Sequence, residues 1–275
     1  MVLKKIFNAD DFGMSHGVNQ AISRAYHEGV LNSTSIMINL DFVDEALDMK
    51  KSMPELNVGL HLNLTNQYPI SDAKDIPLLV DEKGKFKHGF VNLFLLSFFK
   101  PGALRKQIEI ETRAQLEKAI KSGIKLSHID SHRHIHHIPL IFKIVSKLAK
   151  EYNIPRIRVV NENIFNTLKY NNDKSWLSDG GLIKYIILRV LAFGNNYKTE
   201  TYFYSILYTC KLERERFRNL KIPTGYEAVE VGIHPATPEV DEKYMDDVFD
   251  YNILSPWRTK ELETLLDKTV LEEIK

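Results

Sequence analysis

Short apolar runs alternate with longer amphipathic stretches through most of the chain. The short runs have the length and the β-branched content of strands, and in the longer stretches apolar residues recur every three or four positions, as in helices. The predicted strands span residues 4–9, 33–40, 57–64, 125–130, 156–160 and 228–235. Because strands that alternate with helices form parallel sheets covered by those helices, the pattern predicts an α/β fold.

Helices are predicted after several of these strands. Between Ser15, a typical N-cap residue, and Gly29, a typical residue after a helix C-terminus, the apolar positions fall on one helical face. A second helix opens near Asp41, with acidic residues early and lysines late, as the helix dipole favours. Further helices are predicted at residues 106–122, from Pro139 onward, and at 259–274.

The alternation of strands and helices breaks between residues 163 and 221, where an Asn-rich turn, an apolar helical stretch and an aromatic run follow one another. We predict a single domain over residues 1–275, with an insertion or lid at about 163–221. The apolar stretch at 182–193 has the spacing of an amphipathic helix, so it is expected to pack on the rest of the α/β domain or at a dimer interface.

Composition and charge exclude several classes of protein. Hydrophobic residues make up 44% and charged residues 27%, which is enough for a globular core. The net charge of +1 provides no general attraction for nucleic acid, so nucleic-acid binding is not predicted. The apolar runs at 90–99 and 182–193 are shorter than a membrane span, and no export signal is visible, so a cytoplasmic protein is expected. Cys210 is the only cysteine, which excludes an internal disulfide.

Polar clusters lie at the C-terminal ends of four predicted strands. Asp10 and Asp11 follow the first strand, His61 lies in the third, and His234 follows the last. The tract SHIDSHRHIHHIP, at 127–139, follows the fourth and holds five of the ten histidines. In parallel α/β folds these strand ends line one face, so we expect the four clusters to converge there.

Each cluster also has a structural explanation when it is taken alone. The Asp pair could cap a helix, His61 could be a core histidine, and the imidazoles of the tract could bond to loop backbone. Because successive strand residues point to opposite sides, only one of Asp10 and Asp11 is expected to face a given ligand directly. Whether the backbone of the tract is extended or helical, His132 lies on the same side as other histidines of the tract.

An aspartate and two histidines from three strand ends would leave coordination positions open for water. Open positions are typical of catalytic rather than structural metal sites. Since a bound divalent cation lowers the pKa of water and polarises a carbonyl, hydrolysis is the predicted chemistry.

The blocks NADDFGMS, GLHLNLT, HIDSHRHIHHIP, RIRV and EVGIHPA, in this order from Asn8 to Ala236, resemble the YdjC-like carbohydrate deacetylases, which include chito-oligosaccharide and hopanoid-associated deacetylases. The resemblance implies a (β/α) barrel of the glycoside hydrolase/deacetylase type, often dimeric, that removes an acetyl group from an N-acetylated amino sugar. It implies one divalent metal held by Asp11, His61 and His132. The family favours Mg²⁺, whereas two imidazoles suit Zn²⁺, Co²⁺ or Mn²⁺ better.

By the same resemblance, Asp10 is the general base and His234 the acid that protonates the departing amine. The remaining candidates orient ligands or line the sugar subsite; they are Asp130, His134, His136 and Arg158. The last of these could anchor a carboxylate or sugar hydroxyl, or pair with Asp10 or another carboxylate. The segment at 163–221 is longer and more apolar than the chito-oligosaccharide enzymes need, which leaves open a glycolipid substrate and a homodimer.

Three other functions stay open at this point. A metal-dependent phosphoesterase or amidohydrolase also uses Asp and His at barrel strand ends, but it usually carries an H-x-H pair after the first strand, where this chain has Asp-Asp. A non-catalytic saccharide-binding barrel would keep the metal site for structure alone. Non-haem iron oxygenases share the ligand set of two histidines and one carboxylate, but they favour β-sandwich folds.

Overall fold

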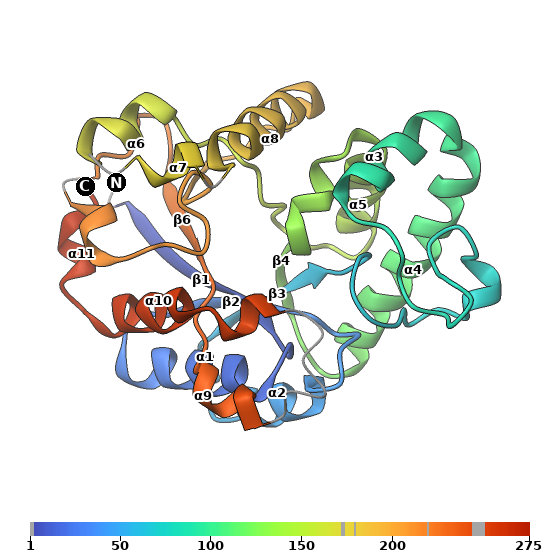
Figure 1. The fold of residues 1–275 in the computed structure, drawn as a ribbon, viewed down its shortest axis with the longest axis horizontal. Coiled ribbons are helices and arrows are strands. Elements are labelled where there is room, and N and C mark those ends of the chain that lie inside the picture. Colours follow the sequence, from blue (N-terminus) through green and yellow to red (C-terminus); the bar gives the residue numbers. More distant parts are fainter. Residues whose placement is uncertain (1–2, 172–173, 179, 219, 244–250) are drawn as a thin grey trace.

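The computed structural model describes residues 3–171, 174–178, 180–218, 220–243 and 251–275 (Figure 1). Among these, six parallel strands form one sheet in the order β4-β3-β2-β1-β6-β5. The strands are β1 (Lys4–Phe12), β2 (Ser33–Ile36), β3 (Asn57–Leu62), β4 (Leu126–Ser131), β5 (Thr201–Tyr204) and β6 (Ala228–Ile233). The predicted α/β fold with a parallel sheet is therefore confirmed.

Helices surround this sheet. In Figure 1, α1, α2, α9 and α10 gather along the lower left, α3, α4 and α5 lie on the right, and α6, α7 and α8 lie at the upper left. Their bounds are α1 (His16–Glu28), α2 (Val43–Lys50), α3 (Phe90–Phe99), α4 (Pro101–Lys121), α5 (Pro139–Glu151), α6 (Ile164–Tyr170), α7 (Ser175–Ser178), α8 (Gly181–Asn195), α9 (Pro238–Asp241), α10 (Pro256–Leu266) and α11 (Val270–Glu273). Short 3₁₀ segments occupy Ala73–Asp75, His132–His137, Arg214–Phe217 and Tyr251–Leu254.

The sheet forms a half-barrel, so the expectation of a closed barrel is wrong. The predicted strand at 156–160 is reduced to one parallel bridge, between Ile157 and Ile129 of β4. Histidine side chains take the backbone groups that a next strand would need: His136 Nε2 bonds to the Arg158 carbonyl, and the Val160 amide donates to His137 Nε2, both at 3.0 Å. The backbone of this segment is satisfied without a further strand, so the ladder stops.

The side chain of Asn161 joins the end of this segment to β5 by hydrogen bonds. The amide of Asn161 donates to the carbonyl of Thr201 at 2.9 Å and accepts from the amide of Phe203 at 2.7 Å. Asn161 thereby caps an edge of the sheet that would otherwise present unpaired backbone groups.

The range 163–221 contains α6, α7, α8 and also β5, which pairs in parallel with β6. Part of this range therefore belongs to the central sheet, and its helices lie together beside it (Figure 1). Its role as an insertion or lid stays a prediction, as does the homodimer. Among the described residues, no helix combines the length and apolar character needed to cross a membrane.

Strand β1 lies at the centre of the sheet, between β2 and β6, and its last six residues are buried. A buried central strand is normally a continuous apolar run. Here Asn8, Asp10 and Asp11 interrupt that run, and each is at most 2% exposed. Because buried charged groups are costly without partners, the end of β1 must be surrounded by compensating groups.

Candidate active site

The carboxyl ends of β1, β3, β4 and β6 meet at a cavity of about 560 Å³. Asp10, Asp11, His61, His132 and His234 all line it. The structure thus brings together the four polar clusters that are distant in the sequence.

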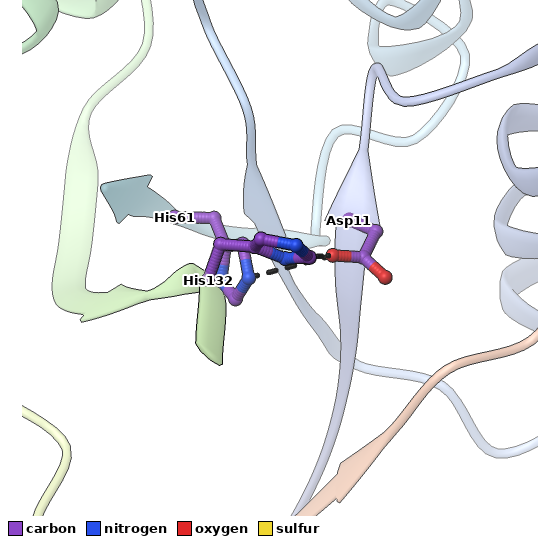
Figure 2. A group of neighbouring side chains, drawn as sticks. All are labelled: Asp11, His61 and His132. Carbon is purple, nitrogen blue, oxygen red and sulfur yellow. Dashed lines mark hydrogen bonds and ion pairs between the residues drawn. The ribbon is translucent and has the colours of Figure 1, made fainter. Parts of the chain in front are cut away.

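Asp11, His61 and His132 point toward one another in Figure 2. Asp11 Oδ1 lies 3.4 Å from His61 Nε2 and 3.2 Å from His132 Nδ1. The three candidate ligand atoms lie within 4.8 Å of one another. One carboxylate oxygen and two imidazole nitrogens form a donor set that divalent first-row transition metals prefer, so these residues fit a metal ion.

A β-bulge turns both aspartates toward the cavity. The register between β1 and β2 shifts between Ala9 and Phe12, and Asp11 adopts a left-handed φ of 71°. Bulges re-aim side chains next to active sites, and this one overrides the alternation of an ordinary strand. Both aspartates therefore line the cavity, while the expectation that only one of them faces a given ligand directly stays a prediction.

Asp11 is held ionised by its neighbours. Burial raises its pKa, but the hydrogen bond with His132 and the charge of Arg258 bring the pKa well below the ordinary value. Arg258 Nη2 donates to Asp11 Oδ2 at 2.9 Å. One carboxylate oxygen is thus occupied by a cation of the chain, while Oδ1 faces the two histidines.

His61 is oriented by a second carboxylate. Its Nδ1 lies 2.8 Å from Asp130 Oδ1. With Asp130 accepting the Nδ1 proton, Nε2 presents its lone pair toward Asp11, the arrangement in which metal-binding histidines usually occur. Burial lowers the pKa of His61, but the carboxylates of Asp130, Asp10 and Asp11 outweigh burial and raise it.

Asp10 lies beside the metal-ligand group and belongs to a separate network. Arg158 binds it through two parallel hydrogen bonds of 2.7 Å each, and Asn8 and Ser35 donate to Oδ1 at 2.8 and 3.2 Å. Burial raises the pKa of Asp10, but Arg158 lowers it far below the ordinary value. Asp10 Oδ2 also lies 3.7 Å from His234 Nε2.

Arg158 is completely buried and joins three carboxylates. Besides Asp10, its Nη2 lies 2.6 Å from Asp130 Oδ2 and its Nε donates to Glu230 Oε1 at 2.6 Å. Of the roles considered for Arg158, the structure shows the pairing with carboxylates. Arg158 lies behind the site and supports Asp10.

His234 is surrounded by groups that favour its protonated form. Burial lowers its pKa, but Cys210, Glu261 and Asp10 together raise it well above the ordinary value. The His234 backbone amide donates to Glu261 Oε2 at 2.6 Å, and its Nδ1 lies 3.6 Å from the same oxygen. These neighbours therefore favour the protonated imidazole of His234.

Beyond β4 the histidine tract forms the short 3₁₀ segment His132–His137, which is interrupted at two residues, so it is neither an extended strand nor a regular helix. Arg133 and His134 adopt left-handed φ values of 56° and 53°, which turn the chain sharply. His134 lines the cavity, whereas His136 bonds to the Arg158 carbonyl. Burial lowers the pKa of both histidines well below the ordinary value, so they are neutral.

Three functional neighbours were missed in the sequence. Arg258 and Glu261 lie three positions apart on α10, and this spacing places them on one helical face. Glu230 is a buried acid in the otherwise apolar strand β6. A buried charge in an apolar strand indicates a partner, but the sequence does not show which one.

Two other groups of side chains have metal-ligand spacing among the described residues. They are Asp10 with His61 and Asp130, and His128 with Asp130 and Glu230. Arg158 contacts all three of these carboxylates, so their charge is already compensated. The Asp11 group is therefore the favoured metal site.

Comparison with known proteins shows which family the chain resembles over most of its length. Residues 4–275 match the family described as YdjC-like protein. A protein from Clostridium beijerinckii named carbohydrate deacetylase is 32% identical over 279 residues, covering 99% of this chain and 95% of that protein. Another of that name, from Brevibacillus brevis, is 44% identical over 153 residues, covering 56% of this chain and 58% of the relative. The match to a Thermoanaerobacter pseudethanolicus relative also spans only 58% of that protein's length.

A solved structure from Enterococcus faecalis, described as a candidate cellobiose-phosphate cleavage protein, has the same overall fold. It superposes with a TM-score of 0.65 at 26% identity, over 99% of this chain and 94% of that one. The similarity therefore extends over the whole domain.

Proposed function

Because the chain belongs to the YdjC-like protein family, we propose that it is a carbohydrate deacetylase that hydrolyses the acetyl amide of an N-acetylated amino sugar. The observation that carries the proposal is the group of Asp11, His61 and His132 in a cavity next to Asp10 and His234. A cavity of about 560 Å³ has the size of a small-molecule site. The name carbohydrate deacetylase, given to the relatives, supports a saccharide substrate.

The proposed cofactor is one divalent cation held by Asp11, His61 and His132. Two nitrogen ligands favour Zn²⁺, Co²⁺ or Mn²⁺ over Mg²⁺, which prefers oxygen. When bound, such a cation would lower the pKa of a water molecule and polarise the acetyl carbonyl. Asp130 would keep His61 in the tautomer that this role requires.

Asp10 and His234 would perform the proton transfers. Asp10 stays ionised, so it can accept the proton of the attacking water, while Arg158 holds its carboxylate in place. The raised pKa of His234 favours its protonated form, from which it can donate to the sugar nitrogen as the C–N bond breaks. Since the two groups lie 3.7 Å apart, the proton taken by Asp10 can return to His234 before the next turnover.

Acetate release tests the proposed reaction. Incubation with N,N′-diacetylchitobiose and related N-acetyl sugars should release acetate, and Asp10→Asn should lower kcat by about 10²–10⁴-fold while the metal content stays unchanged. Asp48→Asn is the matched control, because Asp48 is exposed and lies outside the cavity. If the metal-loaded protein releases phosphate from phosphate esters and no acetate from any N-acetyl sugar, the proposal is wrong.

The pH dependence of turnover tests the role of His234. Because the protonated imidazole is the active form, activity should decline only above the ordinary histidine pKa as pH rises. Glu261 helps to raise this pKa, so Glu261→Gln should shift the alkaline decline to lower pH. A pH–rate profile of both proteins checks the shift, and an unmoved alkaline limb in a folded variant would exclude His234 as the acid.

A further inference from the structure

Helix α10 brings a guanidinium to the wall of the cavity. Arg258 lies in the first turn of α10, its side chain is 4% exposed, and it lines the same cavity as Asp11 and His234. Two of its nitrogens have partners: Nε donates to the Asn252 carbonyl at 3.0 Å, and Nη2 donates to Asp11 Oδ2 at 2.9 Å. These two bonds fix the plane of the guanidinium.

The third nitrogen, Nη1, is buried and has no hydrogen-bond partner among the described residues. A buried charged donor without an acceptor is costly, and native proteins rarely keep one without a reason. Arg258 cannot relieve the cost by losing a proton, because a guanidinium stays charged in proteins. Nη1 therefore lacks an acceptor, and it belongs to a residue that lines the cavity, where a bound molecule could supply one.

We propose that Arg258 Nη1 donates to the carbonyl oxygen of the acetyl group that is removed, and then to the acetate product. The inference rests on the proposed deacetylase function. Nη1 shares its guanidinium with the Nη2 that holds Asp11, so the free donor lies next to the proposed metal ligand. The acetyl group must approach this ligand group to react, which brings its oxygen to the free donor.

This contact would stabilise the transition state of the hydrolysis. As the water oxygen adds to the carbonyl carbon, the carbonyl oxygen gains negative charge, and it loses that charge when the C–N bond breaks. A fixed guanidinium stabilises this oxyanion more strongly than it stabilises the neutral amide, which accelerates the chemical step. Arg258 keeps its proton throughout, so the proton balance of Asp10 and His234 is unchanged.

Arg258→Lys separates this role from support of Asp11. A lysine ammonium can still pair with Asp11, but it is a compact donor that cannot also present the planar second N–H of the guanidinium. We expect kcat to fall about 10²–10³-fold with little change in KM. Cation affinity, measured by competition with a chelator, should stay within about threefold of the original. Arg24→Lys is the matched control, because Arg24 is 56% exposed and pairs only with Glu28 among the described residues.

Binding of acetate gives a readout independent of turnover. Calorimetric titration of the metal-loaded protein with acetate should show affinity at least about tenfold weaker in Arg258→Lys than in Arg24→Lys. A second variant, Arg258→Ala, should regain part of its kcat when guanidinium chloride is added at concentrations that leave the protein folded. Thermal unfolding of each variant reports that the fold is intact.

The outcomes distinguish the inference from the function on which it rests. Full activity of Arg258→Lys once the cation is saturating would leave Arg258 as a positioning residue for Asp11 and overturn the proposal. Equal acetate affinity in both lysine variants would also overturn it. If instead the original protein releases no acetate from any N-acetyl sugar, the deacetylase function itself fails.

Discussion

His61→Ala should remove both cation binding and turnover. His61 supplies one of the three candidate ligands, and its loss leaves Asp11 and His132, too few to hold a divalent cation firmly. A catalytic cation contributes several kcal/mol to transition-state stabilisation, and about 4 kcal/mol corresponds to about 10³-fold in rate. We therefore expect kcat/KM to fall at least about 10³-fold, together with loss of the cation from the purified protein.

A graded series makes this result specific. Asp130→Asn leaves all three candidate ligands in place but removes the charge that holds the His61 Nδ1 proton and pairs with Arg158, so it should weaken cation affinity by about 10–100-fold. His27→Ala, at an exposed histidine of α1, should change neither quantity. Metal analysis and steady-state kinetics of the three variants check this order. If His61→Ala kept the cation content and the kcat/KM of His27→Ala, the proposed metal site would be wrong.

Among the proposed variants, Arg158→Met should cause the largest decrease in the free energy of unfolding. The variant leaves Asp10, Asp130 and Glu230 buried without their shared cation. Breaking a buried ion pair from one side typically costs about 3–5 kcal/mol, so urea unfolding should show a decrease of about that size. Arg113→Met, at a partly exposed pair with Glu151, should have a much smaller effect.

The dependence of this loss on pH has a definite sign. Arg158 lowers the pKa of Asp10 below its unfolded value, so the pair contributes stability at neutral pH and loses it as acid protonates the folded carboxylate. The difference between Arg158→Met and the original protein should therefore shrink on acidification. Adding Asp130→Asn to Arg158→Met should recover part of the stability at neutral pH, because Asp130 Oδ2 is left without a cation once Arg158 is removed, whereas Glu230 keeps its pair with Arg156. A constant difference across pH, with no recovery, would contradict the proposed charge network.

Local pattern was sufficient to predict the central strands and the convergence of their ends. Residues that begin and end helices, such as Ser15 and Gly29, marked α1 correctly. The strand at 156–160 failed for a non-local reason, because imidazoles of the preceding tract bind its backbone. Helix α3 was not predicted, and the single helix expected at 259–274 is divided into α10 and α11. Periodicity describes one segment at a time, and these features depend on contacts between segments.

In the site too, some residues could be predicted from the local sequence and others could not. The family resemblance implied Asp11, His61 and His132 as ligands, and the sequence pattern placed each of them near the C-terminal end of a predicted strand, where β1, β3 and β4 end in the structure. Asp10 and Asp11 share the cavity only through a bulge, which alternation in the sequence does not reveal. Arg258 and Glu261 reach Asp11 and His234 from a helix more than twenty residues beyond β6, and no local motif marks that approach.

Anomalous diffraction from a crystal grown with Zn²⁺, Co²⁺ or Mn²⁺ tests the proposed position of the cation most directly. We expect one strong peak within bonding distance of Asp11 Oδ1, His61 Nε2 and His132 Nδ1, facing the cavity. A peak at the His128, Asp130 and Glu230 group, or none at Asp11 with the cation in excess, would contradict it.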